Sequence, residues 1–313
     1  MTVSLVTGGN RGIGLAICKA LVERSKDNVV WMGARNPERA AEALATWKSS
    51  GVDESARERV HLVQLDVTDQ ASVDAAAAYF KAHDVTLDVL VNNAGVALDL
   101  PWSKHPPTAA TCDTTMAVNV RGVQRVFHAM RPLLAKDARV VNVSSGAGPM
   151  NMEKTSETRQ ATLLADDLTE DTLDTLVEEF SAEYKQAVDE SAKASTTLPC
   201  ASPTGWWLQA YGFSKAAVNA LTHIWARDNK DLLVTCCTPG LVDTDMVASY
   251  TGSSTKKSPE EGAATPVWLA TAPRQDIQNG RMYGNDCKLL PWQLHAYSPL
   301  TLHTQAGASK ANS

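Results

Sequence analysis

The strongest constraint on the fold is an alternation of short apolar runs with longer stretches of helical period. Such an alternation is typical of βαβ units, in which parallel strands lie between two layers of helices. Helices are predicted over residues 12–24, 37–47, 70–82, 111–134 and 211–227. Strands are predicted over residues 3–7, 29–33, 60–65, 87–91, 139–145, 232–237 and 281–283. We therefore predict one α/β domain with a doubly wound, parallel, seven-stranded sheet.

An insertion interrupts this alternation before the helix predicted from Tyr211. A strand normally leads into its crossover helix within a few residues, but here residues 149–205 intervene. Apolar residues recur every three or four positions from Leu173 to Val188, which predicts an amphipathic helix. Residues 191–204 are rich in Ser, Thr, Ala and Pro and predict a loop. The domain should span residues 1–287, and the tail 288–313 shows no period.

The acidic charge of the chain is concentrated in this insertion. The chain has 29 basic and 35 acidic residues, for a net charge of -6. Residues 166–193 contain ten acidic residues and two lysines, a net of -8, so the remainder sums to +2. We interpret the predicted helix as a solvated cover for the edge of the domain rather than a dedicated partner site.

Composition also excludes several classes of protein. No apolar run approaches the ~18 residues that span a bilayer, and the N-terminus does not resemble a secretory signal, so we expect a soluble cytoplasmic protein. The net negative charge argues against nucleic-acid binding. The six cysteines are scattered and no histidines stand at zinc-ligand spacing, so no metal site is expected.

A glycine-rich loop follows the first predicted strand. The sequence Gly8-Gly9-Asn10-Arg11-Gly12-Ile13-Gly14 opens the first predicted helix. Glycines there allow a tight turn and a close approach to a pyrophosphate, whose charge is favoured at a helix N-terminus. This arrangement predicts a Rossmann-type dinucleotide site, although the spacing differs from the G-x-G-x-x-G form.

The end of the second strand indicates which dinucleotide binds. NAD sites usually carry a carboxylate there for the ribose 2′-OH, whereas this strand ends in Gly33-Ala34-Arg35. The Arg35 guanidinium can pair with a 2′-phosphate, and Arg11 adds a second positive charge nearby. We therefore expect NADPH rather than NADH.

Tyr211 and Lys215 form the sharpest chemical pattern in the chain. Of the six tyrosines, Tyr211 alone has a lysine four residues later, which places both side chains on one face of a helix. An adjacent ammonium stabilises a phenolate and lowers the phenol pKa from about 10. Tyr211 is therefore a candidate general acid.

Four further motifs accompany this pair in order along the chain. They are Asn92-Asn93-Ala94-Gly95 after the fourth strand, Asn119 in a helix, Asn142-Val143-Ser144-Ser145 ending the fifth strand, and Pro239-Gly240-Leu241-Val242-Asp243-Thr244 after the sixth. With these motifs the chain, as far as about Cys287, resembles the short-chain dehydrogenase/reductase family.

The resemblance implies a catalytic set. Tyr211 would protonate the carbonyl oxygen, and Lys215 would hold the nicotinamide ribose and lower the phenol pKa. Ser145 would hydrogen-bond the substrate oxygen, and Asn119 would position a water in a proton relay. The implied cofactor contacts are Gly8, Asn10, Arg11, Gly12, Ile13, Gly14, Arg35, Asp66, Val67, Asn92, Ala94, Gly95, Tyr211, Lys215, Pro239, Gly240, Val242 and Thr244.

The insertion resembles that of one subgroup, the monomeric NADPH-dependent carbonyl reductases. Gly205-Trp206, Cys236-Cys237 and residues 257–263 support this likeness. In most of the family a subunit contact uses the surface near the tyrosine helix, which the insertion would cover, so a monomer is expected. Thr238 and Leu241 depart from the animal enzymes at positions that border the substrate pocket, so substrate preference is not transferred.

The implied activity is the NADPH-dependent reduction of a ketone, aldehyde or quinone to an alcohol. A specific biosynthetic ketoreductase or alcohol dehydrogenase of the same family is the nearest alternative. A non-catalytic NADPH-binding regulator on the same fold is a second alternative, against which the intact catalytic set argues. A serine hydrolase would need Gly-x-Ser-x-Gly, which neither Ser145 nor Ser214 satisfies.

Overall fold

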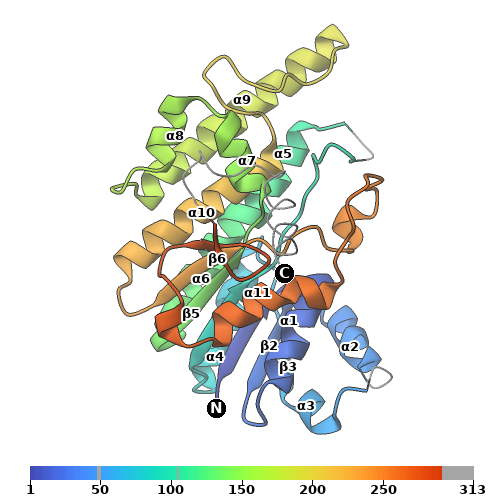
Figure 1. The fold of residues 1–313 in the computed structure, drawn as a ribbon, viewed down its shortest axis with the longest axis vertical. Helices are drawn as coiled ribbons and strands as arrows, with labels where there is room; N and C mark the ends of the chain where they lie inside the picture. The colour runs from blue at the N-terminus through green and yellow to red at the C-terminus, as the bar shows by residue number, and fades with distance from the viewer. Residues whose placement is uncertain (48–50, 104–105, 291–313) are drawn as a thin grey trace, which may run out of the picture.

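The computed structural model describes residues 1–47, 51–103 and 106–290. One sheet runs through the molecule in the order β3-β2-β1-β4-β5-β6-β7-β8 (Figure 1). Its strands are β1 (Val3–Thr7), β2 (Val29–Ala34), β3 (Val60–Gln64), β4 (Leu87–Asn92), β5 (Leu134–Val143), β6 (Leu233–Cys237), β7 (Met282–Tyr283) and β8 (Leu289–Leu290).

Seven strands are parallel, as predicted, and the eighth is an addition. β8 pairs antiparallel with β7, so the sheet has eight strands among the described residues rather than seven. β8 consists of Leu289 and Leu290 alone, and it lies where the sequence shows no assignable period. β8 also lies in the predicted tail 288–313, whose remaining residues 291–313 fall outside the described structure.

Helices cover both faces of the sheet. The larger core lies on the face covered by α4, α6 and α10, and the smaller core on the face of α1, α2 and α11. α1 and α11 lie side by side (Figure 1). The helices are α1 (Gly12–Glu23), α2 (Pro37–Thr46), α3 (Glu54–Glu58), α4 (Gln70–Ala82), α5 (Ala109–Met116), α6 (Gly122–Met130), α7 (Ala147–Lys154), α8 (Glu157–Leu163), α9 (Glu170–Ala194), α10 (Ala210–Asp228) and α11 (Pro259–Thr271).

The helix predicted over residues 111–134 is not continuous. A π-helical segment, Ala117–Arg121, separates α5 from α6, and the last residue of the prediction already belongs to β5. A π-bulge has no signature in an apolar period, which explains why the sequence predicted a single helix.

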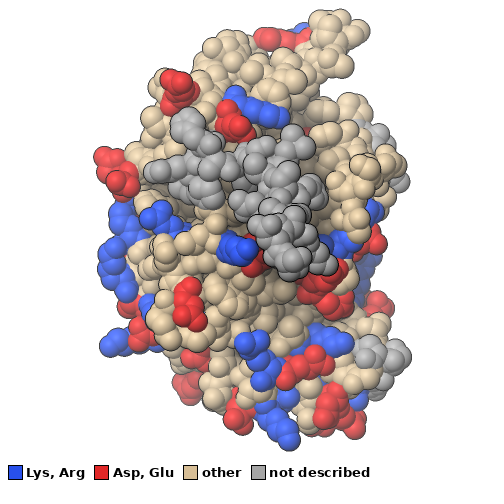
Figure 2. All heavy atoms as spheres, in the orientation of Figure 1, with Lys and Arg blue, Asp and Glu red and all other residues tan. Residues whose placement is uncertain are grey.

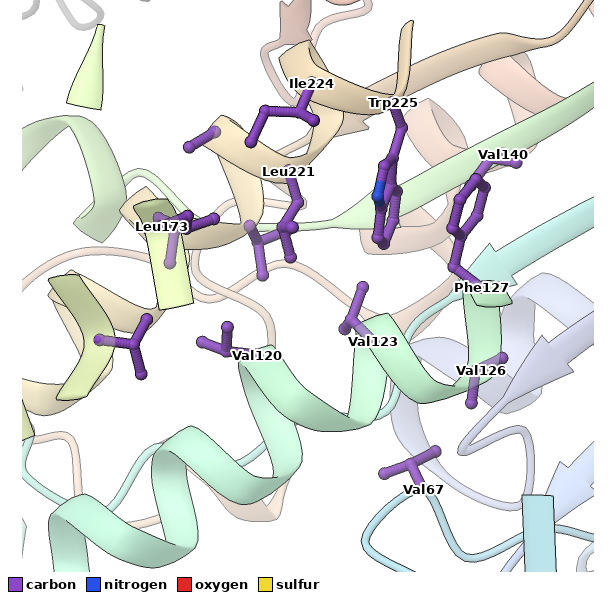
Figure 3. Close-up of a cluster of buried hydrophobic side chains, with 14 of the residues drawn as sticks. Val67, Val120, Val123, Val126, Phe127, Val140, Leu173, Leu221, Ile224 and Trp225 are labelled. Carbon is purple, nitrogen blue, oxygen red and sulfur yellow. The ribbon is translucent and has the colours of Figure 1, made fainter. Parts of the chain in front are cut away.

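The insertion forms α8 and the long helix α9, which lie at the end of the molecule opposite the N-terminus (Figure 1). α9 extends further than its apolar stripe, since residues 191–194 continue the helix where a loop was predicted. Its Leu173 enters the cluster formed by Val120 and Val123 below α10 residues Leu221 and Trp225 (Figure 3). The insertion is therefore part of the larger core and not an appended segment.

Surface charges of both signs are interspersed on the face shown in Figure 2. No helix in the described part of the chain is long and apolar enough to cross a bilayer. Within the same residues no group of His, Cys, Asp and Glu is arranged to hold a metal ion.

Candidate functional site

The motifs singled out in the sequence meet at one edge of the sheet. The glycine loop follows β1, Arg35 follows β2, Asp66 follows β3, Ser145 follows β5 and Pro239 follows β6. Because these strands are parallel, their carboxyl ends lie at the same edge. The strand order reverses between β1 and β4, and in open α/β sheets the crevice at such a switch point binds ligands.

The glycine loop forms a cradle that side chains would fill. Gly8 and Gly12 have φ angles of +64° and +51°, which favour glycine. A Cβ atom at Gly14 would lie 2.3 Å from the Gly8 carbonyl oxygen. Arg11, the residue before α1, makes no side-chain capping bond to the first turn. The first-turn N–H groups thus suit a pyrophosphate, with Asn10 and Ile13 in the same loop.

Two residues outside the predicted set hold this cradle in place. Asn93 Nδ2 donates to the Thr7 and Gly8 carbonyl oxygens at 2.9 and 3.2 Å. The Thr7 hydroxyl accepts the backbone N–H groups of Asn93 and Ala94, each at 3.0 Å. The sequence offered a signal for Asn93, which is inside the Asn-Asn-Ala-Gly motif, but none for Thr7.

Arg35 follows β2, the neighbour of β1 in the sheet, and Arg11 lies in the glycine loop itself. Arg35 is exposed at the end of β2, where a 2′-phosphate would be accessible to it. Arg11 forms an ion pair with Asp245 at 3.1 Å, and both side chains are largely exposed. An exposed pair of this kind is weak, so Arg11 remains available to a competing phosphate.

Asp66 and Val67 follow β3, and their side chains have different surroundings. Asp66 Oδ1 accepts the N–H and hydroxyl of Thr68 at 2.9 and 2.7 Å, which fixes the carboxylate at the edge of the crevice. The Val67 side chain is buried beside α6, where Val126 lies near it (Figure 3) and a Cβ at Gly122 would be 2.9 Å from one of its methyl groups. Any contact of Val67 with a cofactor therefore comes from its backbone.

Within the Asn-Asn-Ala-Gly motif, the Asn92 side chain has a structural role, and Ala94 and Gly95 lie at the crevice. Asn92 is buried and donates to Asn142 Oδ1 at 2.8 Å, so its side chain ties β4 to β5 instead of facing the crevice. Ala94 faces the cradle, since its Cα is 3.1 Å from where a Gly8 Cβ would be. A Cβ at Gly95 would lie 3.5 Å from Lys215 Nζ, an ordinary van der Waals contact, so Gly95 lies beside the lysine side chain.

The loop after β6 folds back over the glycine cradle. Gly240, with φ +83°, makes the turn after Pro239, and its N–H donates to Thr238 Oγ1 at 3.3 Å. The Thr244 methyl lies 3.1 Å from where a Gly12 Cβ would be. Val242 is buried and pairs with Lys257. The loop is therefore in reach of a dinucleotide held in the cradle.

Tyr211 lies in the first turn of α10 and faces Ser145 at the end of β5. Burial raises the pKa of the Tyr211 phenol above its ordinary value, and interaction with the Ser145 hydroxyl offsets part of that rise. The phenol is consequently neutral at pH 7 and able to donate a proton. Ser145 Oγ also accepts the Ala147 N–H at 3.2 Å, which orients the hydroxyl.

Lys215 lies one turn further along α10 and is buried. Its Nζ donates to the Val143 carbonyl oxygen at 2.9 Å and lies 5.9 Å from the centre of the Tyr211 ring. Burial lowers the pKa of the Lys215 ammonium to about 8. We expected Lys215 to lower the pKa of the Tyr211 phenol, but that pKa is raised. Burial of the phenol is the larger effect, and the Lys215 ammonium donates its hydrogen bond to the backbone of β5.

Asn119 occupies the π-helical segment and is completely buried. Its Oδ1 accepts the Val96 N–H and its Nδ2 donates to the Val96 carbonyl oxygen, both at 2.8 Å. Nδ2 also donates to Ser214 Oγ at 3.0 Å, and Ser214 donates to the Tyr211 carbonyl oxygen at 2.7 Å. The structure thus links Asn119 to the tyrosine helix through Ser214, which the sequence did not single out.

The described site is therefore a glycine cradle beside Ser145, which is partly buried, and the buried pair Tyr211 and Lys215. The family model for short chain dehydrogenase matches residues 2–157. The chain belongs to the short-chain dehydrogenase/reductase family and is an oxidoreductase of that family.

The similar proteins include carbonyl reductases from animals and a reductase from a plant. Carbonyl reductase (NADPH) 1 from Homo sapiens is 36% identical over 278 residues, 87% of this chain and 91% of that protein. Its counterpart from Rattus norvegicus is 34% identical over 297 residues, 93% and 98% of the two chains. Salutaridine reductase from Papaver somniferum is 31% identical with a TM-score of 0.73, covering 90% of this chain and 99% of that one.

Proposed function

We propose that this protein reduces a ketone, aldehyde or quinone to the alcohol with NADPH as the hydride donor. The observation that carries the proposal is the pairing of Tyr211 and Ser145 at the crevice beside the glycine cradle. One group is a neutral acid, and the other is a hydroxyl oriented by the backbone. Two neighbouring hydroxyl groups that can donate hydrogen bonds suit the oxygen of a carbonyl substrate.

Three residues of this chain have separate roles in the proposed reaction. The bound nicotinamide supplies the hydride. Ser145 donates a hydrogen bond to the carbonyl oxygen and holds the substrate, while the Tyr211 phenol gives its proton to that oxygen as negative charge develops. Lys215 places a buried cation beside the reacting groups, where it favours that developing charge.

Arg35 supports NADPH as the cofactor. It is an exposed cation at the end of β2, where an NAD-specific site usually has a carboxylate. The named animal relatives are NADPH-dependent carbonyl reductases, which agrees with this reading of Arg35.

A narrow biosynthetic reductase is the second candidate. Salutaridine reductase shares 31% identity at a TM-score of 0.73, whereas an NADPH-bound carbonyl reductase from chicken fatty liver has a TM-score of 0.61. The family resemblance also implies that Thr238 and Leu241 depart from the animal enzymes at positions bordering the substrate pocket. The two candidates share the chemistry and differ only in substrate range.

The test is oxidation of NADPH or NADH by the purified protein with a panel of quinones, aldehydes and cyclic ketones. Replacing Tyr211→Phe removes the proton donor and should lower kcat by about 10² to 10⁴, the usual contribution of general acid catalysis. NADPH binding, followed by fluorescence, should persist in the variant. Undiminished turnover in this variant would remove Tyr211 from the mechanism.

The ranking of substrates decides between the candidates. Comparable rates with several unrelated carbonyls indicate a broad reductase, and a rate confined to one compound indicates a biosynthetic one. Tight NADPH binding with no turnover on the panel would favour the regulatory alternative.

We also propose that the protein acts in the cytoplasm as a monomer. All six cysteines are unpaired, as is usual in a reducing compartment. α9 packs against α5 and α10 and occupies the surface beside the tyrosine helix. A second copy therefore finds that surface already covered.

A further inference from the structure

Tyr211 lies in the first turn of α10, whose N–H groups have no partners within the helix. The first N–H groups of any α-helix have no partner within the helix and need one elsewhere when they are buried. In α10 the Phe213 N–H bonds to the Gln209 carbonyl oxygen at 3.0 Å. The preceding residue, Gln209, makes no side-chain capping bond. Ala210 and Tyr211 are both buried, so their N–H groups require an acceptor from another element.

Asp99 supplies that acceptor from a segment more than a hundred residues earlier. Its Oδ1 accepts the Tyr211 N–H at 3.0 Å, and its Oδ2 accepts the Ala210 N–H. Bonds from backbone N–H groups to a carboxylate are shorter and stronger than neutral ones. The two bonds use both oxygens, so the carboxylate fixes the direction of the first turn as well as its position.

A third donor reaches Asp99 from the insertion. The Tyr184 hydroxyl of α9 donates to Asp99 Oδ2 at 3.2 Å, and the Tyr184 side chain is fully buried. Burial raises the pKa of Asp99, while the bonds from Tyr211, Ala210 and Tyr184 act in the opposite direction. The insertion therefore helps to fix the Asp99 carboxylate, which in turn binds the first turn of α10.

The segment that carries Asp99 also contacts the rest of the site. It follows β4, and within it Asn93 bonds to the glycine cradle and Val96 is bonded on both its N–H and its carbonyl to Asn119. One short segment thus connects the cofactor cradle, Asn119 and the first turn of α10. A shift of Asp99 would move Tyr211 relative to the other two.

We propose that Asp99 is a positioning residue for Tyr211, and that Tyr184 extends this function to the insertion. The inference rests on the proposed function, in which the Tyr211 hydroxyl must meet a carbonyl oxygen held by Ser145. Asp99 touches neither substrate nor cofactor in this role. It fixes the backbone from which the phenol projects, and a misplacement of about 1 Å in such a group can reduce turnover by about 10².

The experiment compares Asp99→Ala, Asp99→Asn and Tyr184→Phe with a matched control, Glu170→Gln. Glu170 also ties α9 to α10, through Trp225 Nε1 at 2.6 Å, but at the opposite end of α10 from Tyr211. Both sites thus anchor the insertion, and only Asp99 contacts the first turn. The measurements are kcat, KM for NADPH, thermal unfolding and amide hydrogen exchange of the peptide spanning residues 208–214.

Asp99→Ala should lower kcat by about 10- to 100-fold with KM for NADPH changed by less than about twofold. Asp99→Asn keeps one acceptor oxygen and should recover part of the loss, while Tyr184→Phe removes one donor and should have the smallest effect. Exchange should quicken in residues 208–214 for the Asp99 variants only. Glu170→Gln should change thermal unfolding and leave kcat unchanged.

Equal kcat in folded Asp99→Ala and Glu170→Gln would overturn the inference. If Asp99→Ala does not fold, unchanged kcat in both Asp99→Asn and Tyr184→Phe overturns it instead. A wild-type protein inactive on every carbonyl would defeat the proposed function separately. Hydrogen exchange then decides the inference: faster exchange at 208–214 in Asp99→Asn supports it and unchanged exchange refutes it.

Discussion

At the scale of single residues, burial shifts the two titratable side chains of the site in opposite directions. Both are removed from water, which disfavours the charged form of each. The pKa of the Tyr211 phenol is raised and the pKa of the Lys215 ammonium is lowered to about 8. Lys215 is consequently the first of the pair to lose its proton as the pH rises.

The pH profile of carbonyl reduction should report this order. Below about pH 8 the phenol and the ammonium are both protonated, and above it the cation is lost, so kcat/KM should fall with an apparent pKa near 8. The measurement is kcat/KM between pH 6 and 10. Lys215→Arg keeps its charge throughout and should move the fall to higher pH. A profile that stays flat to pH 10 would contradict the assignment.

The lowered pKa of Lys215 also makes the stability of the free protein depend on pH. Because the pKa of Lys215 is lower in the folded state than in the unfolded chain, the unfolded chain binds the proton more tightly. The buried charge therefore destabilises the fold below about pH 8. This destabilisation is relieved as the pH rises from about 8 towards the ordinary lysine value of 10.5.

Arg35 should decide between the two nicotinamide cofactors. Arg35→Asp removes a cation that pairs with the 2′-phosphate and adds a carboxylate that repels it. Charge-assisted bonds of this kind contribute about 1.5–3 kcal/mol, so kcat/KM for NADPH should fall by about 10- to 100-fold while NADH is used as well or better. Arg24→Asp at the opposite end of α1 is the control for charge alone. An unchanged cofactor ratio would assign the discrimination to another residue.

At the scale of elements, the start of α9 is held by one acidic residue. Glu170 accepts bonds from Trp225 Nε1 at 2.6 Å, His128 Nε2 at 3.0 Å and Gln124 Nε2 at 3.4 Å. Trp225 in turn stacks on Phe127, with ring centres 3.9 Å apart (Figure 3). Glu170 thus joins the insertion to both α6 and α10.

Glu170→Gln should destabilise the protein by about 1–2 kcal/mol near pH 6, as measured by urea unfolding. Burial alone would raise the pKa of Glu170, but its three donors outweigh burial and the pKa lies below the ordinary value. Its contribution therefore disappears as the pH falls below about 4.5. The pKa of His128 is raised by the bond to Glu170, so the stabilisation from that pair is present below about pH 6.5 and is lost as the pH rises further.

The difference between wild type and variant should therefore be largest between about pH 5 and 6.5. Glu178→Gln on the same helix is the control, because Glu178 is largely exposed and its ion pair with Arg121 is 3.6 Å long. A loss of stability no greater than that of the control would show that Glu170 does not anchor α9.

At the scale of the whole molecule, the insertion determines which surfaces are free. α9 lies against α5 and α10, and Lys185 bonds to Asp113 of α5 at 3.0 Å. Sedimentation or light scattering at micromolar concentration should give the mass of one chain, 33.6 kDa. A mass of twice that value would mean that the molecule associates through another surface.

The sequence predicted the strands of the parallel sheet and the glycine loop after the first of them. Both depend on local properties: apolar runs of strand length, and glycines whose positive φ angles other residues rarely adopt. Tyr211 and Lys215 were also recognisable, because the spacing on one helix fixes their neighbourhood without reference to the rest of the chain.

Other features of the fold and of the site had no local signal in the sequence. The π-helical segment that carries Asn119 leaves the apolar period unchanged, and β8 is only two residues long. Asn92 belonged to the right motif, yet its side chain is directed into the sheet. Its partner Asn142 comes from a different strand, and no spacing along the chain could indicate that contact.

The sequence by itself determined the fold class, the glycine loop after the first strand and the Tyr211–Lys215 spacing, because each depends on neighbours along the chain. Only the tertiary structure decided the directions in which the pKa values of Tyr211 and Lys215 shift and the bonds from Asp99 to the first turn of α10. The physical reason is that burial and hydrogen bonding depend on segments far apart in the sequence. Asp99 and Tyr211 are 112 residues apart, and folding brings Asp99 Oδ1 to 3.0 Å from the Tyr211 backbone nitrogen.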